Sequence, residues 1–177
     1  MKRSVHIVFL ALALPLCMAS GRAQTRADTP THGNLGPHIA VGSVNGVRLG
    51  LRYFPIPTLA LEAAGGYLQI TLLRENERKE YTDGYSATIG GSWYTHPDAL
   101  ISPMLSLLAT YIAGTTLPDG YAQNRVAIVP SLGSEYFFLD GFSIFFRFGP
   151  AFQFVSEPGD SHFETTTQFD GGVSLLF

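Results

Sequence analysis

Apolar side chains recur at every second position in stretches of about ten residues along most of the chain. Between residues 47 and 54, for example, Val47, Leu49, Leu51 and Tyr53 alternate with glycine and arginine. Alternation with a period of two is the pattern of a β-strand that has one apolar face. No segment after the first two dozen residues holds an apolar run of the roughly 20 residues that a membrane-spanning helix needs. The pattern therefore predicts an all-β chain.

Turn residues separate these stretches, and eight strands are expected. They are predicted at residues 37–44, 47–54, 59–72, 85–94, 101–113, 125–138, 143–155 and 164–177. The second, fourth and sixth connections are short, whereas the third, fifth and seventh are longer and more polar. The first connection, Asn45-Gly46, departs from this alternation because it is short where a long one is expected. This dipeptide favours a tight hairpin.

Repeated alternating segments, an even strand count and this alternation of loop lengths are typical of membrane barrels, whose short turns face the periplasm. The sequence predicts an eight-stranded antiparallel up-and-down transmembrane β-barrel in a bacterial outer membrane. Both termini are expected in the periplasm.

The charged residues inside the expected strands all fall on the face opposite the apolar one. They are Arg48, Arg52, Glu62, Glu135, Arg147 and Asp170. A basic side chain that faces lipid at the midplane costs roughly 2–4 kcal/mol, so these six are expected to face the lumen. Eight strands leave room only for side chains inside, which predicts a salt-bridged interior without an open channel.

Two ion pairs are expected from the hairpins. Folding the second strand on the third places Arg52 opposite Glu62, and folding the sixth on the seventh places Glu135 opposite Arg147. Buried charges are tolerated when they are paired and hydrogen-bonded. These pairs are predicted to be structural.

Aromatic residues gather near the expected strand ends, which is typical of the two interfacial girdles of a membrane barrel. The inner girdle is predicted from Tyr53, Trp93, Tyr136 and Phe177, and the outer one from Tyr67, Tyr85 and Tyr111. Two prolines, Pro130 and Pro150, fall inside expected strands and close to each other across a hairpin. Because proline lacks a ladder donor, a shared bulge is expected there.

The last nine residues alternate to a terminal aromatic residue. Phe169, Gly171, Val173, Leu175 and Phe177 share one face. This resembles the closing-strand signal of outer-membrane barrel proteins, and the mature chain resembles small barrels of the OmpA/OmpX type. The resemblance implies a structural, adhesive or small-ligand role. It also implies that the barrel-insertion machinery, outer-membrane lipid and lipopolysaccharide are the partners of a monomeric barrel.

The amino terminus reads as an export signal. Lys2 and Arg3 precede an apolar run that is too short to span a bilayer, and cleavage is expected after Ala23. Residues 1–23 are then the signal peptide, 24–36 a flexible tail and 37–177 the barrel. The single cysteine, Cys17, lies in the removed part, so no disulfide is expected. The residue before it, Leu16, is not the small residue that a lipoprotein site requires.

The charge balance argues against nucleic acid as a partner. Cleavage leaves 8 of the 11 basic residues against 14 acidic ones, whereas nucleic-acid binding requires a basic face.

No catalytic, metal or cofactor site is predicted. The four remaining histidines, His32, His38, His96 and His162, are scattered by the expected topology. One alternative is a lipid A-modifying outer-membrane enzyme, which would need a nucleophile, a base and an acid together. The nearest candidates are Ser161, His162 and Glu164, but adjacent residues of an extended strand point to opposite faces.

A second alternative is a soluble periplasmic barrel that binds a lipid or small ligand. Gly91-Ser92-Trp93 resembles the lipocalin Gly-x-Trp motif, although it lies in mid-chain. Such a barrel would be apolar inside and polar outside, and the sequence predicts the reverse. The function expected is therefore a membrane scaffold, or a barrel that presents external loops for binding. The charged segment at residues 74–80 is expected to be a solvated loop.

Overall fold

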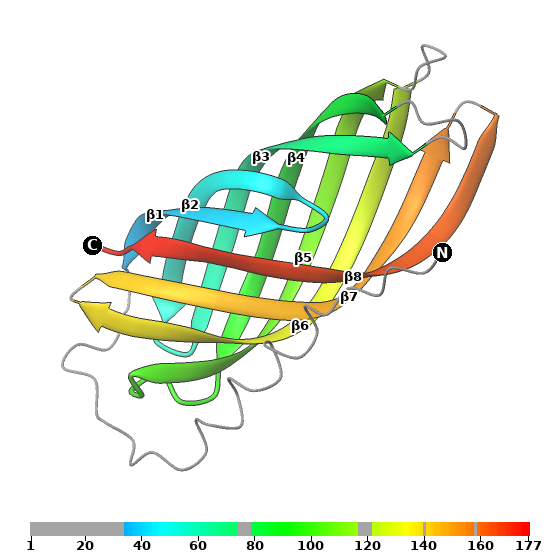
Figure 1. Cartoon of the computed structure of the whole chain (residues 1–177). Coiled ribbons are helices and arrows are strands. Elements are labelled where there is room, and N and C mark those ends of the chain that lie inside the picture. The colour runs from blue at the N-terminus through cyan, green and yellow to red at the C-terminus, as the bar shows by residue number, and fades with distance from the viewer. Residues whose placement is uncertain (1–33, 74–78, 117–121, 140, 158) are drawn as a thin grey trace.

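The computed structural model describes residues 34–73, 79–116, 122–139, 141–157 and 159–177. The strands are β1 (Leu35–Gly42), β2 (Gly46–Ile56), β3 (Leu59–Leu73), β4 (Lys79–Tyr94), β5 (Ile101–Thr116), β6 (Ala122–Leu139), β7 (Phe142–Glu157) and β8 (Asp160–Leu175). Each pairs antiparallel with the next, and β8 pairs with β1, so the sheet closes into a barrel (Figure 1). The predicted eight-stranded up-and-down barrel is confirmed. Within the described residues, no helix is long and apolar enough to cross a membrane.

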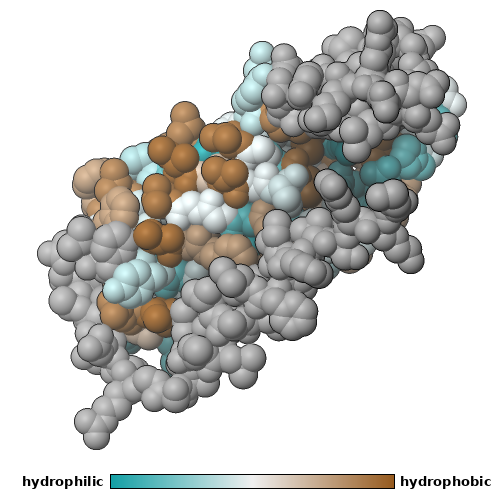
Figure 2. Space-filling model, viewed as in Figure 1, coloured by the Kyte–Doolittle hydropathy of each residue, from teal (hydrophilic) through white to brown (hydrophobic). Residues whose placement is uncertain are grey.

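Alternation along each strand decides which side chains face the lumen. In β7, Phe145 and Arg147 are buried inside, whereas Ile144 and Phe146 are exposed outside. Apolar side chains gather on the outer surface of the strands, as Figure 2 shows for one side of the molecule. The apolar faces read from the sequence are therefore the outward faces.

The two rims of the barrel differ. At the terminal rim, Leu35 and Phe177 exchange backbone hydrogen bonds of 3.2 and 3.1 Å, so both ends of the barrel chain lie together. The short β2–β3, β4–β5 and β6–β7 connections lie at this rim. At the opposite rim, the β3–β4, β5–β6 and β7–β8 hairpins project well beyond the β1–β2 hairpin (Figure 1).

Several strands are longer than predicted at this opposite rim. β4 begins at Lys79 rather than at Tyr85, and β8 begins at Asp160, inside the expected loop at residues 156–162. Both faces of these extensions carry polar residues, so hydropathy alternation disappears while backbone pairing continues. β1 also begins at Leu35, two residues before the expected start of the barrel. The expected signal peptide and residues 24–33 of the tail lie outside the described residues.

The Asn45-Gly46 hairpin is present as predicted. Gly46 has a φ of +68°, and a Cβ atom at this position would lie 2.3 Å from the carbonyl oxygen of Tyr67. Both the left-handed conformation and the close approach require glycine. The turn is therefore held tightly against β3.

The expected bulge at Pro130 and Pro150 is wrong. The β6–β7 ladder is interrupted between Ile128↔Phe152 and Leu132↔Phe148, but the register is the same on both sides. An inserted residue would shift the register. The two prolines interrupt the pairing because neither offers a backbone donor.

Two apolar clusters fill the lumen at different heights. The inner cluster lies toward the terminal rim and consists of Ala40, Phe54, Ala60, Tyr94, Met104, Phe137, Phe145 and Leu176. The outer cluster consists of Leu108, Ala127, Val129 and Ala151, against which Val44 of the β1–β2 turn packs. The charged residues of the lumen lie between these clusters.

Candidate functional site

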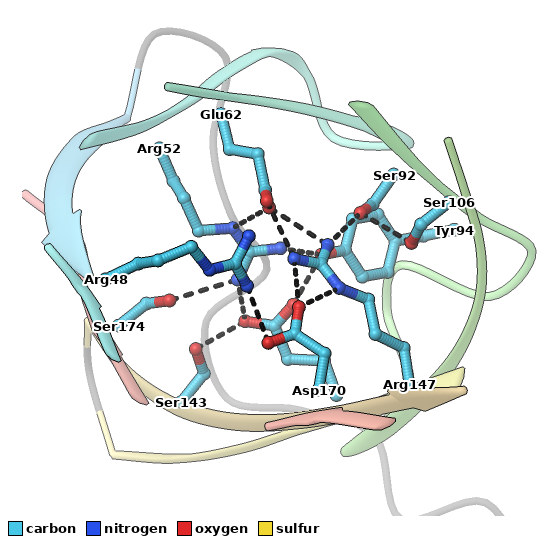
Figure 3. A network of polar contacts seen from close by, with 11 residues as sticks. Arg48, Arg52, Glu62, Ser92, Tyr94, Ser106, Ser143, Arg147, Asp170 and Ser174 are labelled. Atoms are coloured by element: carbon cyan, nitrogen blue, oxygen red, sulfur yellow. Dashed lines mark hydrogen bonds and ion pairs between the residues drawn. The ribbon is translucent and has the colours of Figure 1, made fainter. Parts of the chain in front are cut away.

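The six charged residues singled out in the sequence all lie inside the barrel. Arg48, Arg52, Glu62, Glu135, Arg147 and Asp170 are each no more than 5% exposed. They come from β2, β3, β6, β7 and β8, and their side chains converge across the lumen (Figure 3). Three guanidinium groups face three carboxylates, so the cluster is balanced in charge.

One half of the cluster is organised around Arg52. Its guanidinium group donates to Glu135 at 2.9 Å, to the hydroxyl of Ser174 at 3.0 Å and to the hydroxyl of Tyr94 at 2.6 Å. The hydroxyls of Tyr94 and Ser143 donate in turn to Glu135. Charge-assisted bonds of this kind orient both ions and satisfy several of their polar atoms.

The other half is organised around Arg147. Its two terminal nitrogens donate to the two oxygens of Glu62 at 3.0 and 2.7 Å, which is a bidentate pair. Its Nε donates to Asp170 at 2.7 Å, and Asp170 also accepts from Arg48 at 2.6 Å. Arg147 on β7 therefore connects Asp170 of the neighbouring strand β8 with Glu62 of β3, across the lumen.

The expected partners are only partly those of the structure. Arg52 does lie opposite Glu62 in the β2–β3 register, but the closest approach of their charged groups is 3.9 Å. The expected juxtaposition of Glu135 and Arg147 is wrong, because Glu135 lies opposite Phe145 and Arg147 lies opposite Gly133. The close pairs of Arg52 with Glu135 and of Arg147 with Glu62 cross the lumen, where neighbouring-strand register does not reveal them. The close pair of Arg147 with Asp170 lies between neighbouring strands, in the β7–β8 register.

Phe145 is a central residue that the sequence analysis did not select. Its ring centre lies 4.9 Å from the guanidinium carbon of Arg52 and 5.2 Å from that of Arg147. A cation above an aromatic face is attracted by the ring quadrupole. Phe145 alternates with the outward Ile144 and Phe146. The two-residue period of the strand was therefore the sequence signal that predicts its position in the lumen.

Neutral hydroxyl pairs cross between β4 and β5. Thr88 and Thr110 are 3.0 Å apart, and Ser92 and Ser106 are 2.8 Å apart, with all four buried. Each hydroxyl pair satisfies polar atoms that would otherwise be buried alone. These four residues occupy the polar positions of alternating segments, and this alternation was the sequence signal that could have placed them in the lumen.

The aromatic residues of both predicted girdles point outward. Tyr67 and Tyr85 make an edge-to-face contact at 6.0 Å, and their strands pair at these residues. At the terminal rim, Trp93 and Phe177 are exposed. The residues of the closing strand share this orientation, with Phe169 and Leu175 exposed on the outside of β8.

The residues considered for catalysis do not form a triad. His162 and Glu164 are 3.1 Å apart on one side of β8, whereas the hydroxyl of Ser161 belongs to the opposite side. Among the described residues, no group of three or more histidine, cysteine, aspartate or glutamate side chains could hold a metal ion. His38 is buried in the lumen, whereas His96 lies in the β4–β5 connection.

The fold and the lumen together define a class: a closed eight-stranded barrel with a charge-paired interior and an apolar exterior. A solved structure similar to this chain is the crystal structure of Acinetobacter baumannii CarO. It is 10% identical in sequence and has a TM-score of 0.48, and the match covers 80% of this chain and 97% of that chain. No family model and no curated protein matches the sequence.

Proposed function

We propose that this chain is an integral outer-membrane protein whose barrel is a membrane scaffold with a closed lumen and externally projecting hairpins. The observation that carries the proposal is the polarity of the wall. Large apolar side chains are exposed on all eight strands, among them Leu49, Ile89 and Leu107 at 64%, 65% and 57%. The charged residues in the middle of the strands are buried inside.

Water would not stabilise this arrangement. Exposed apolar patches of soluble monomers rarely exceed a few hundred square ångströms, whereas here the apolar belt surrounds the barrel. A bilayer solvates such a belt and is excluded from the polar lumen. The same polarity argues against the alternative of a soluble lipid-carrying barrel, which requires the reverse.

The contents of the lumen support the absence of an open pore. The inner cluster, the ion-pair cluster and the outer cluster occupy successive levels between the two rims. An eight-stranded barrel has an interior just wide enough to be filled by side chains. We expect no stable conductance step when the protein is inserted in a planar bilayer.

The proposal includes an orientation and partners. The terminal rim faces the periplasm because it has the short connections, and the long hairpins face the exterior. The outward Phe169, Val173, Leu175 and Phe177 are the proposed signal for the barrel-insertion machinery. Outer-membrane lipid and lipopolysaccharide surround a monomeric barrel, with no cofactor.

Gel mobility tests the proposal directly. Membrane fractions of cells that produce the full chain are extracted in detergent and run with and without boiling. We expect the protein in the outer-membrane fraction, with an unboiled form that migrates differently from the boiled form. Recovery in the soluble periplasmic fraction, with no heat-dependent shift, would overturn the proposal. Altered lipid A acylation in the same cells would instead support the enzyme alternative.

A further inference from the structure

The outer half of β8 has a paired strand on one side only. β8 pairs with β7 along its whole length from Asp160 to Leu175, with no shift in register. Its other neighbour, β1, ends at Gly42 and pairs with β8 only from Asp170 onward. No other described strand pairs with β8, and its outer part projects beyond the β1–β2 hairpin (Figure 1). This part of β8 is therefore a sheet edge in an otherwise closed barrel.

Hydrogen bonds at the β1–β2 turn show which backbone groups face this edge. The amide of Phe169 donates to the hydroxyl of Ser43 at 3.0 Å, and its carbonyl accepts from the Ser43 amide at 2.8 Å. Because the backbone groups of a strand point to alternate sides, odd-numbered residues of β8 present theirs to the edge and even-numbered residues to β7. The edge therefore offers the amides of Phe163, Thr165 and Thr167, which no described strand pairs with.

This edge lacks the features that usually prevent strand pairing. Exposed edges are commonly protected by proline, lysine, a bulge or a covering segment. Residues 161–168 contain no proline, lysine or glycine, and their register with β7 has no shift. Three of them in a row, Thr165, Thr166 and Thr167, are exposed and have a high β-propensity. The edge is therefore suited to pairing with another strand.

A second copy of the barrel does not fit this edge. Two copies in a symmetric pair within one membrane are related by an axis along the membrane normal, and the strands tilt about 35–45° from that direction. Two β8 strands related in this way would cross at about 70–90°, so they could not pair over several residues. The edge therefore fits an extended segment that is not held in the bilayer.

The side chains along the edge select the chemistry of such a segment. Glu164 and Asp160 project from one face of β8, where both contact His162, at 3.1 and 3.9 Å. Phe163 projects from the other face, is 64% exposed and stacks on Phe152. Opposite charges and aromatic–β-branched pairs stabilise neighbouring strands. A segment with a basic residue on one face and β-branched residues on the other therefore complements the edge.

We infer that the edge of β8 at residues 161–167 binds an extended segment of another protein by β-strand addition. The segment pairs antiparallel with β8, and its backbone accepts from the amides of Phe163, Thr165 and Thr167. It carries a lysine or arginine opposite Glu164 and a β-branched residue opposite Phe163. The inference rests on the proposed function, because the proposed orientation places this edge outside the cell.

The test measures amide exchange in the mature chain, isotopically labelled and folded into phosphatidylcholine nanodiscs. Without a peptide, the amides of Phe163, Thr165 and Thr167 are expected to exchange about tenfold or more faster than those of Glu164 and Thr166, which face β7. The probe is the capped heptapeptide Val-Thr-Val-Lys-Val-Thr-Val. We expect it to slow exchange saturably at the three edge amides and to leave the other two unchanged.

A matched peptide and two variants separate backbone pairing from other contacts. N-methylation of the second and third valines removes two donors but keeps every side chain, and is expected to abolish binding. Thr165→Pro removes an edge amide without touching the bonds to β7, and is expected to abolish binding as well. Glu164→Lys is expected to weaken binding about tenfold and to favour a peptide with glutamate in place of lysine.

The outcomes separate the edge from the barrel itself. Heat-shifted mobility with no response to the peptide, or with equal exchange at edge and β7-facing amides, would overturn the inference and leave the proposed barrel standing. Equal binding of the N-methylated peptide to the wild-type chain would overturn strand addition even if Thr165→Pro does not fold. Equal binding of the lysine and glutamate peptides would overturn the charge requirement. Absence of heat-shifted mobility in the wild-type chain would overturn the membrane barrel, and the external position of the edge with it.

Discussion

Arg147 has the densest set of polar contacts in the lumen. It makes two hydrogen bonds to Glu62 and one to Asp170, and it also lies beside the ring of Phe145. Its removal would leave Glu62 without its bidentate partner and Asp170 with Arg48 as its single arginine. Both carboxylates are buried in the lumen. Losing such a residue is costly mainly because it leaves buried charges without a partner.

The first prediction concerns this uncovered charge. Arg147→Met should lower the free energy of unfolding by about 3–5 kcal/mol, because breaking a buried pair leaves an uncompensated ion. Urea unfolding in lipid vesicles, followed through the fluorescence of the single tryptophan, Trp93, measures it. A loss below about 1 kcal/mol, the range of exposed ion pairs, would contradict the buried network.

A double-mutant cycle distinguishes the contacts of the structure from those expected from hairpin register. The coupling between Arg147 and Glu62 should lie within the range of about 0.5–3 kcal/mol found for contacting residues. The coupling between Arg52 and Glu62 should be smaller, because their charged groups are 3.9 Å apart and Arg52 bonds to Glu135 instead. The reverse order of the two couplings would show that the hairpin pair dominates.

A third prediction tests how closely β6 and β7 approach each other beside this arginine. A Cβ atom at Gly133 would lie 2.2 Å from the carbonyl oxygen of Phe146 and 2.7 Å from the Cβ of Arg147, whereas one at Gly65 would meet nothing within 4 Å. Gly133→Ala should therefore destabilise the barrel by about 1–3 kcal/mol, and Gly65→Ala, the control, should not. Equal effects in urea unfolding would indicate that β7 leaves room for a side chain at Gly133.

At the scale of elements, the β1–β2 hairpin is the irregular member of the barrel. It stops while its neighbours continue, and its turn packs into the lumen through Val44. The turn closes the lumen from the outer side, and its residues Gly42, Ser43, Val44 and Gly46 line a cavity of about 470 Å³ there. Its conformation should therefore affect both stability and the cavity.

The fourth prediction compares two turn glycines that both have positive φ. Gly46→Ala adds a side chain that would lie 2.3 Å from the Tyr67 carbonyl, whereas Gly159→Ala meets nothing within 4 Å. Backbone strain at positive φ costs both variants about 1–2 kcal/mol. Any further loss of unfolding free energy in Gly46→Ala therefore measures the close approach of residue 46 to the Tyr67 carbonyl. If the unfolding midpoints of the two variants shift equally, the β1–β2 turn does not approach β3 as closely as the structure shows.

The elements themselves were largely predictable from the sequence. Alternation determined the strand count, the order and the outward faces because the core and the outer surface demand opposite side chains. The ends of β4 and β8 at the opposite rim were not predictable, because both faces of those segments are polar. Pairing continues there through backbone hydrogen bonds, which leave no pattern in side-chain hydropathy.

The lumen was predictable in its members but only partly in its pairs, since Arg147 and Asp170 pair in the β7–β8 register whereas other close pairs cross the lumen. The six charges stood out because each occupies the polar face of an alternating segment. Their partners depend on which walls of a closed barrel face each other, as Arg52 with Glu135 and Arg147 with Glu62 show. Sequence gives the register of adjacent strands, whereas contacts across the lumen depend on the tilt and stagger of the whole barrel.

At the scale of the whole molecule, the barrel has its polarity reversed relative to a soluble protein. Its largest buried side chains are Arg48, Arg52 and Arg147, and its exposed side chains are mainly leucine, isoleucine, valine and aromatic residues. Hydrophobic burial in water contributes little to such a fold. In the proposed membrane setting, lipid would solvate the apolar wall, and the closed strand pairing satisfies backbone groups that a bilayer cannot.

The last prediction tests this reversed polarity by depth. Leu107 lies in the middle of β5 and Phe163 near the outer end of β8, and they are similarly exposed at 57% and 64%. In a bilayer, Leu107→Arg should cost about 2–4 kcal/mol of unfolding free energy in lipid vesicles, and Phe163→Arg only about 0–1 kcal/mol. Around a soluble barrel, both substitutions would fall within about 0.5 kcal/mol of the parent, because surface changes are nearly neutral there. The difference between the two variants therefore depends on the bilayer, and two equal values would contradict the membrane assignment even if the barrel itself is intact.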